Sequence, residues 1–351
     1  MPPDGTAPAP QASSPAPQSR DASPRRSHPV LRFVLTRAGA GVVTLLIVSV
    51  LIFLCTSVIP GDAVTVILGK NGTPKTVAAL QARLGLDAPL YRQYLDWLTG
   101  MLRGDLGKSV VALAQHQPDP SIASTIKSPL INSLILGAIT SALLVPVTLL
   151  LGALAGTKAD SAVDHAISIP SLILAGLPEF VTGALLIYVT FTLLHLLPPV
   201  SLVAPGASPL ATPDVLVLPV LTLLIVAVGS GVRQVRLGMI ESLQADCVQF
   251  ARLNGVAERR VLIRYGMRNA VANSVQTIAQ NLQYLVGGII VVESVFAYPG
   301  IGIYLVSAVV ARDANKILAA AIILAALYTV INIVADLMVV FLVPKLRTEL
   351  V

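Results

Sequence analysis

Long apolar runs alternate with short polar segments along most of this chain, and the pattern predicts a bundle of membrane-spanning helices. A helix needs about 20 apolar residues to cross the hydrocarbon core of a bilayer. The third of the runs that reach this length contains Pro170 and Pro178, so we expect a tilted or broken helix there. The predicted fold is an all-α integral membrane protein with six transmembrane helices, at 33–59, 130–157, 166–197, 214–232, 272–297 and 317–343.

The segments outside these runs define the predicted domain organisation. Residues 1–28 are rich in Pro, Ala and Ser and have almost no large apolar side chain, which predicts a disordered tail. The tail has neither the basic start nor the short apolar core of a signal peptide, so we expect the first span to be uncleaved. Residues 29–351 form the predicted membrane domain, with an outer loop at 60–129. Within that loop, the spacing of Leu90, Tyr94, Trp97, Leu98 and Met101 predicts a helix at the outer interface.

The basic residues give the predicted orientation. Arginines precede the first span, fill the segment after the fourth and follow the last, whereas the short loop 198–213 has no Lys or Arg. Basic residues concentrate in cytoplasmic loops. We therefore expect both termini and the segment 233–271 to be cytoplasmic.

Composition agrees with a membrane protein and excludes several other classes. Hydrophobic residues make up 55% of the chain and charged residues 12%, about half the share found in soluble domains. The net charge of +6 comes largely from arginines beside the spans, without the aromatic interleaving of nucleic-acid-binding proteins. Cys55 and Cys247 fall in separate regions, so no disulfide is expected. The four histidines form no metal-binding motif, and no metal site is expected.

The arginine-rich segment 233–271 is the most informative polar stretch. Its pattern predicts a helix from Gly238 to Leu253, a turn at Gly255 and a second helix from Ala257 to Ala270. The second helix places arginines on one face, at positions 260, 264 and 268. A helix, a sharp turn and small side chains suit a segment that docks into a groove on a partner. The alternative is that the arginines only fix the membrane topology.

No site for chemistry of the chain's own emerges. The stretch Gly104 to Ser109 ends like a phosphate-binding loop, but Leu102 stands where that motif requires glycine. No nucleophile elbow and no pair of catalytic carboxylates is present, so no catalytic residue is predicted.

Polar residues inside the spans are the other candidates, because charged or polar groups at membrane depth usually face protein or water. Gln276, Gln280 and Gln283 recur on one face of the fifth span, and Glu179 lies in the third. These residues line a translocation pathway or, alternatively, form hydrogen bonds between helices. Asp336 is expected to be structural. Close helix packing is expected at Gly152 and Gly156.

The arginine-rich segment resembles the cytoplasmic EAA loop of ABC-importer permeases. The general form of that loop is Glu-Ala-Ala, three residues, Gly, nine residues, then Ile-x-Leu-Pro. Aligning its glycine with Gly255 places Gln249, Phe250 and Ala251 at the first three positions. The last three motif positions differ, with Tyr265, Met267 and Arg268 in place of Ile, Leu and Pro.

A closer resemblance is to the first of the two permease subunits of dipeptide and oligopeptide importers. It rests on blocks in the expected order over residues 31–347: IPGDAV (59–64), LGLDAPLYRQYLDWLTGMLRGDLGKSV (84–110), GLPEFVTG (176–183), FARLNGVAERRVLIRYGMRNAV (250–271), VVESVFAYPGIGIYLVSAVVARD (291–313) and INIVADLMVVFLVPKL (331–346).

This resemblance implies the type I ABC importer permease fold in a bacterial cytoplasmic membrane. It implies a homologous second permease, two ATP-binding cassette ATPases that bind ATP and Mg²⁺, an extracytoplasmic solute-binding protein, membrane lipid and a peptide substrate. No cofactor is expected in this chain. The residues expected to couple it to the ATPase are Asp246, Gln249, Phe250, Ala251, Arg252, Asn254, Gly255, Val256, Glu258, Arg259 and Arg260.

Two alternatives stay open on the sequence alone. Relatives of these importers carry nickel, glutathione or other small solutes. An ion-coupled secondary transporter is the alternative from another class, although the two halves of the chain show no obvious repeat.

Overall fold

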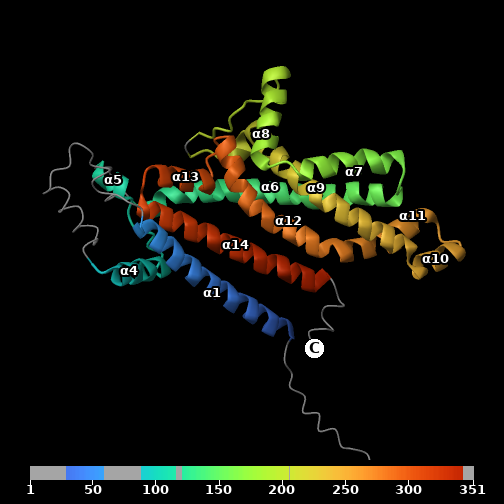
Figure 1. Cartoon of the computed structure of the whole chain (residues 1–351), viewed down its shortest axis with the longest axis horizontal. Coiled ribbons are helices and arrows are strands. Elements are labelled where there is room, and N and C mark those ends of the chain that lie inside the picture. Colours follow the sequence, from blue (N-terminus) through green and yellow to red (C-terminus); the bar gives the residue numbers. More distant parts are fainter. Residues whose placement is uncertain (1–28, 59–87, 116–120, 205, 343–351) are drawn as a thin grey trace, which may run out of the picture.

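The computed structural model describes residues 29–58, 88–115, 121–204 and 206–342. The predicted disordered tail 1–28, the block IPGDAV at 59–64 and the end of the last predicted span lie outside the described residues. The described part is helical and contains no strand. Its long helices run side by side as an elongated bundle (Figure 1).

Five described helices are long and apolar enough to cross a membrane, and a bent pair of helices forms a sixth candidate span. The five are α1 (Pro29–Val58), α6 (Ile122–Thr157), α9 (Asp214–Gln244), α12 (Arg268–Val295) and α14 (Ala314–Leu342). The pair is α7 (Ala162–Ala175) and α8 (Glu179–Ile187), which continues as the π-helical segment η2 (Tyr188–Leu193). These spans agree with the prediction of six.

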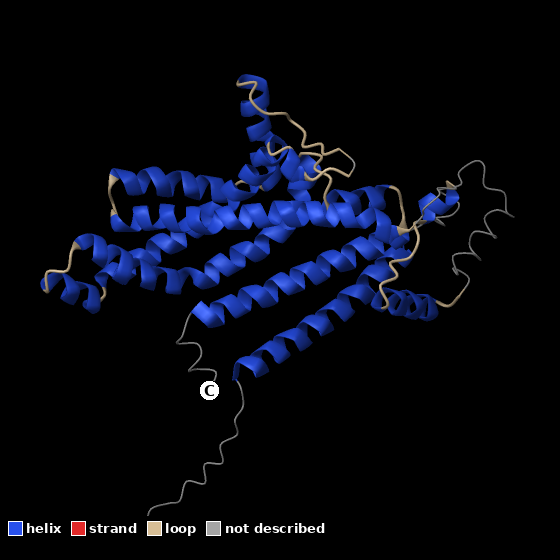
Figure 2. Ribbon diagram, turned by 180° about the vertical axis from the view of Figure 1, so that it is seen from behind, coloured by secondary structure: helices blue, strands red, loops and turns tan. Residues whose placement is uncertain are grey.

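The third predicted span is broken rather than tilted, and its two parts meet at 111°. Gly176 ends α7, and Pro178 precedes α8 with an extended backbone (φ −61°, ψ 150°). Proline disfavours helical geometry in the residue before it, so the helix cannot continue through this point. As a result, α8 projects sideways from the bundle (Figures 1 and 2).

Helix α9 is the central helix and packs against α6, α7 and α12. A Cβ at Gly152 would lie 2.5 Å from Cβ of Val235, and one at Gly156 would lie 2.6 Å from Cβ of Met239. Only glycine allows so close an approach, which confirms the close packing predicted for these two positions. The α6–α9 contact thus holds the central helix from one side along its C-terminal half.

The two remaining spans lie at one side of the bundle. Helix α14 packs against α12 and α1 packs against α14. The Arg37 Nε atom on α1 lies 3.1 Å from Oδ2 of Asp336 on α14. This ion pair between spans agrees with the structural role predicted for Asp336.

The shorter helices gather at the two ends of the bundle. Figure 1 shows α4 (Leu90–Leu102), α5 (Val110–Ala114) and α13 (Ile301–Val310) at one end. It shows α10 (Asp246–Leu253) and α11 (Glu258–Arg260) at the other. The predicted outer loop and the predicted cytoplasmic segment therefore occupy opposite ends of the molecule.

At the α13 end, a buried carboxylate holds the chain in place. Glu293 on α12 accepts hydrogen bonds from the Ser133 hydroxyl on α6 and from the backbone N–H of Gly302 at 2.7 Å. Asp313 plays a similar part, because it accepts hydrogen bonds from the hydroxyl of Ser109 and from the backbone N–H of Val110 at the start of α5.

Candidate functional site

The arginine-rich segment is suspended between the continuations of two spans. Helix α9 does not end with its apolar run at residue 232 but continues to Gln244. Ala245 then adopts an extended backbone (ψ 143°), and α10 starts at Asp246. On the return side, α11 leads into the π-helical segment η4 (Val261–Met267), which runs directly into α12.

Two predicted boundaries in this segment are therefore wrong. The helix expected from Gly238 to Leu253 is two helices, because the chain turns at Ala245. The second helix, expected to end at Ala270, continues into the fifth span. A single residue, Ala245, joins α10 to α9, and η4 joins α11 to α12 without a break, so short connections hold the segment α10–α11 stiffly to the membrane domain.

Gly255 forms the predicted turn after α10. Its φ is +75°, in the left-handed region that favours glycine. The N–H of Gly255 donates to the carbonyl of Arg252 at 3.0 Å, and the N–H of Val256 donates to that of Ala251 at 3.1 Å. This pair of bonds is the Schellman arrangement that ends many helices.

The inner face of α10 is fixed by a small apolar cluster. Val248 and Ala251 are buried and pack with the buried Val261 of η4. The half-buried residues Leu243, Val256 and Tyr265 surround them. Ala251 and Val256, which we expected to take part in coupling, therefore help to hold the shape of the segment.

The outer face of α10 carries large exposed apolar side chains. Phe250 is 70% exposed, and Leu253 is 87% exposed. Exposed apolar groups on a short helix at the end of the bundle are typical of a surface that a partner covers. Leu253 was missed from the sequence, where it only marked the end of the longer predicted helix. The other predicted coupling residues on this surface are exposed: Asp246, Gln249, Arg252, Asn254, Gly255, Glu258, Arg259 and Arg260.

An ion pair spans the turn. Arg252 donates from Nη2 to Oε1 of Glu258 at 2.6 Å and from Nε to Oε2 at 3.1 Å. These hydrogen bonds lower the pKa of the Glu258 carboxyl below its ordinary value and raise the pKa of the Arg252 guanidinium. The two-pronged geometry ties α10 to α11 across Gly255.

The predicted pathway residues lie on α12 and α8. Gln276 and Gln280 are exposed and Gln283 is half-buried, so the stripe faces away from the rest of the bundle. Glu179 starts α8 and lies beside α12, where it interacts with the hydroxyl of Tyr284. Tyr284 is 53% exposed and extends the polar face, a contribution that the sequence alone did not reveal.

A cleft of about 580 Å³ separates α7 from α9, and we call it the α7–α9 cleft. The sequence did not predict it. Two arginines of α9 lie in its wall, and its remaining lining is small or hydroxylated apart from Leu172 and Val232. The lining residues are Ser168, Ser171, Leu172, Ala175, Gly176, Gly229, Ser230, Val232, Arg233 and Arg236.

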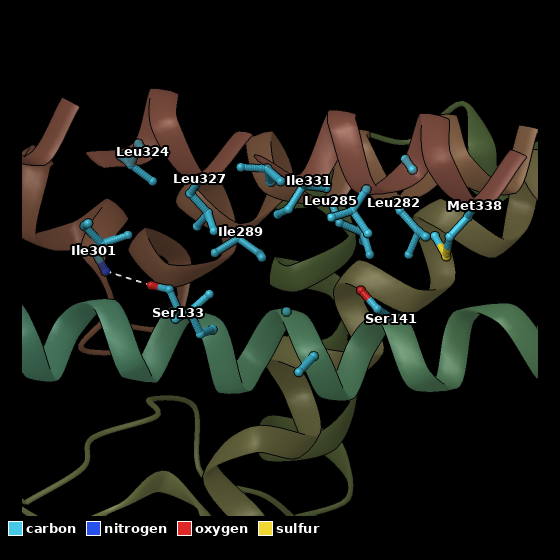
Figure 3. Close-up of a pocket in the computed structure, with 16 residues that line it drawn as sticks. Ser133, Ser141, Leu282, Leu285, Ile289, Ile301, Leu324, Leu327, Ile331 and Met338 are labelled. Atoms are coloured by element: carbon cyan, nitrogen blue, oxygen red, sulfur yellow. Dashed lines mark hydrogen bonds between the residues drawn. The ribbon is translucent and has the colours of Figure 1, made fainter. Parts of the chain in front are cut away.

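A second cavity, of about 310 Å³, lies between α6, α12 and α14. Figure 3 shows leucine and isoleucine side chains of α12 and α14 converging above α6, with Ser133 and Ser141 as polar groups. Ser133 is already engaged, since its hydroxyl accepts from the N–H of Ile301 at 2.8 Å. An apolar cavity of this kind offers nothing to a charged solute, so the polar face of α12 is the better candidate for the pathway.

The described residues hold no cluster suited to a metal ion. Within the ranges that the structure describes, no group of three or more His, Cys, Asp or Glu side chains is placed to bind one. Cys55 and Cys247 are both free and exposed.

Comparison with known proteins places these features in a family. The family model for the inner membrane component of binding-protein-dependent transport systems matches residues 148–348. The model for the N-terminal part of the membrane component of these systems matches residues 30–129. Together the two matches cover nearly the whole described chain except residues 130–147 of α6.

Named relatives match over nearly their whole length. A Brucella suis protein, provisionally named a peptide permease, is 32% identical over 91% of this chain and 99% of its own. A Brucella abortus protein, provisionally named a peptide transport system permease, is 30% identical over 90% of this chain and 99% of its own. A metal-staphylopine import system permease of Staphylococcus aureus is 29% identical over 91% of this chain and 99% of its own.

Proposed function

The chain belongs to the family of binding-protein-dependent transport system inner membrane components, and we propose that it carries peptides through an ATP-driven importer. Membership makes it a transport subunit in the membrane. The relatives provisionally named as peptide permeases support peptides as the solute. The match to a metal-staphylopine permease favours a second candidate, the import of a small metal chelate.

The observation that carries the coupling role is the stiff segment α10–α11 with its exposed Phe250 and Leu253. We propose that these side chains enter a groove on an ATPase, with the exposed residues Asp246, Gln249, Arg252, Asn254, Glu258, Arg259 and Arg260 around them. Because only Ala245 separates α10 from α9, and η4 continues directly into α12, a displacement of α10 is transmitted to the fourth and fifth spans.

The proposed partners follow from the same arrangement. No phosphate-binding loop is present in the sequence, so separate ATPases bind ATP and Mg²⁺ in this proposal. A solute-binding protein delivers the substrate to the α4–α5 end. A second permease covers the projecting α8–η2 arm, where Phe180, Tyr188 and Phe191 are about half exposed. The segment α10–α11 then faces the cytoplasm with both termini on the same side, in a bacterial cytoplasmic membrane.

The pathway is proposed to run along the polar face of α12. Gln276 and Gln280 point away from the packed side of this helix, where Leu285, Ile289 and Val292 belong to the main core. Gln283, Tyr284 and Glu179 continue the face toward the bend between α7 and α8. A polar face at membrane depth is stable only beside water or protein, which a second permease provides.

Substitution of Gly255 tests the coupling role. Valine in a left-handed conformation costs at least ~1–2 kcal/mol, whereas asparagine tolerates that conformation. The complex, reconstituted in proteoliposomes with its second permease, ATPases and binding protein, is assayed for tri-alanine uptake and ATP hydrolysis. We expect Gly255→Val to lower the uptake per ATP about tenfold or more, and Gly255→Asn to stay near the wild type.

A steric clash does not complicate the comparison of the two variants, because nothing lies within 4 Å of a Cβ built on Gly255. Equal uptake per ATP in the valine variant would refute the coupling role. Uptake by the wild type without ATP would refute the importer itself.

A further inference from the structure

The α7–α9 cleft contains an arginine that the rest of the described chain leaves without a partner. Arg236 is neutralised by the Asp164 carboxylate, with hydrogen bonds of 2.6 and 2.5 Å. Arg233 lies one helical turn nearer the membrane centre, is exposed, and forms no hydrogen bond or ion pair with any described residue. A guanidinium that lines a cleft and has no counter-charge among the described residues is free to bind a ligand of opposite charge.

The floor of the cleft is the open face of α9. Arg233 is exposed there and Ser230 is half-buried. Helix α9 packs against α7 on one wall of the cleft and also against α12. The apolar run of α9 ends at residue 232, so Arg233 directly follows it in the part of the helix that leads to α10.

The cleft is joined to the proposed pathway. The Ser230 hydroxyl donates to Oδ1 of Asn281 on α12 at 3.0 Å. Asn281 directly follows Gln280, which belongs to the exposed polar stripe. The wall of the cleft is therefore hydrogen-bonded to the helix that carries this stripe.

The hydroxyl groups of the cleft already use their protons. Ser168 donates to Asp164 at 2.8 Å and Ser171 donates to the carbonyl of Ile167 at 2.7 Å. Because Arg236 is paired with Asp164, Arg233 is the one charged side chain in the described lining of the cleft that has no counter-charge. The cleft thus offers one guanidinium group to bind one anionic group.

We propose that the α7–α9 cleft is an anion site in which Arg233 binds the carboxylate of the imported solute on its way to the cytoplasm. The proposal rests on the proposed transport function and assigns a chemical class to its substrate, namely a solute with a free carboxylate such as the C-terminus of a peptide. The planar guanidinium fits a carboxylate through two parallel hydrogen bonds. A lipid phosphate is the competing occupant, and protection of a thiol in the cleft separates the two.

The first test measures the charge of the cleft without any substrate. In the full complex, with Cys55 and Cys247 replaced by serine, Leu172→Cys provides a thiol on the exposed wall of the cleft. An anionic sulfonate and a cationic trimethylammonium methanethiosulfonate reagent are compared for their reaction rates. We expect the anionic reagent to react faster than the cationic one. Arg233→Gln should lower the ratio of the anionic to the cationic rate about fivefold or more. Lys158→Gln, at the inner end of α6, is the matched control with an unchanged ratio.

Three results would overturn the site. The thiol could fail to react with either reagent, which would place it in lipid. The ratio of the rates with the anionic and cationic reagents could be the same in Arg233→Gln as in the wild type. Phosphatidylglycerol in the vesicles, rather than tri-alanine, could protect the thiol, which would assign the site to lipid phosphate.

The second test uses uptake of tri-alanine and of its C-terminal amide by the reconstituted complex. We expect Arg233→Gln to raise the KM for tri-alanine about tenfold and to leave uptake of the amide unchanged. An equal loss for both solutes, or no loss for either, would refute carboxylate binding. A wild-type complex that imports neither solute would instead refute the peptide substrate, while the thiol reactivity would still decide whether the cleft attracts anions.

Discussion

Arg236 and Asp164 form a two-pronged ion pair, in which Nε donates to Oδ1 at 2.6 Å and Nη2 donates to Oδ2 at 2.5 Å. The Asp164 side chain is almost fully buried, and it also accepts from the Ser168 hydroxyl and the Asp160 N–H. The pair fastens the start of α7 to the part of α9 that leads into α10. Relative movement of these two helices therefore requires breaking a fully hydrogen-bonded buried charge.

Substitution of Asp164 by asparagine should destabilise the membrane domain. The variant leaves the Arg236 guanidinium without its counter-charge, and breaking a buried pair in this way costs ~3–5 kcal/mol. We expect a clear fall in the midpoint of thermal unfolding of the detergent-solubilised protein. Asp160→Asn is the matched control, since Asp160 is exposed and lies 3.9 Å from Arg236. Equal midpoints for the two variants would show that the pair contributes little.

Substitution of Gly156 by alanine should also destabilise the bundle. A Cβ there would lie 2.6 Å from Cβ of Met239 and 2.8 Å from the backbone oxygen of Arg236, so α6 and α9 must move apart. Overpacking of this kind costs ~1–3 kcal/mol, more than the helix propensity that alanine adds. Gly39→Ala on α1 meets nothing within 4 Å and should be neutral or stabilising. The midpoints of thermal unfolding of the two variants are compared. Equal midpoints would show that the α6–α9 contact is loose enough to accept a methyl group.

The spans were predictable because apolar length alone sets them, but their ends were not. The prediction stopped the fourth span at residue 232 because arginines follow. Polar side chains end a run of apolar residues without ending the helix. In α9 the helix continues past this point, and Arg236 pairs with Asp164, 72 residues away in the sequence. The bend after α7 was only partly foreseen, since prolines at 170 and 178 both occur and only the second breaks the helix.

The candidate site was predictable where local rules govern it. Gly255 was identified because a turn after a helix favours glycine, and the structure gives it the expected positive φ. The burial of individual side chains in this segment was not predictable from the sequence. Ala251 and Val256 belong to the internal cluster of the segment, whereas Leu253 is exposed, because the break at Ala245 rotates α10 relative to α9.

Substitution of Gln280 by leucine should reduce transport without affecting folding. Gln280 is exposed on the polar face of α12, so a pathway role predicts slower tri-alanine uptake by the reconstituted complex, by about tenfold. A role in hydrogen bonding between helices predicts a lower unfolding midpoint instead. Thr44→Val on the exposed side of α1 is the control, because its hydroxyl bonds only to the carbonyl of Ala40. Normal uptake with a reduced midpoint would assign Gln280 to packing.

The ion pair across the coupling turn should be insensitive to pH in the physiological range. The pKa of Glu258 is lowered by Arg252, so the pair's contribution is fully present above the ordinary glutamate pKa and is lost only as pH falls through the lowered value. We expect the uptake per ATP of Glu258→Gln to be modestly reduced at both pH 6 and pH 8 by the same factor. A defect that appears at only one of these pH values would contradict the assigned pair.

Substitution of Glu293 by glutamine should loosen α13 from the bundle. The carboxylate accepts from Ser133, from the Gly302 N–H at 2.7 Å and from the Ile303 N–H at 3.3 Å, so every bond requires an acceptor. A carboxamide replaces one acceptor oxygen by a donor, and an unsatisfied buried group costs ~1–3 kcal/mol. The unfolding midpoint should fall, while Ser294→Ala, whose hydroxyl bonds only within α12, should leave it unchanged. If Glu293→Gln unfolds like the wild type, the carboxyl already carries a proton and donates one of these bonds itself.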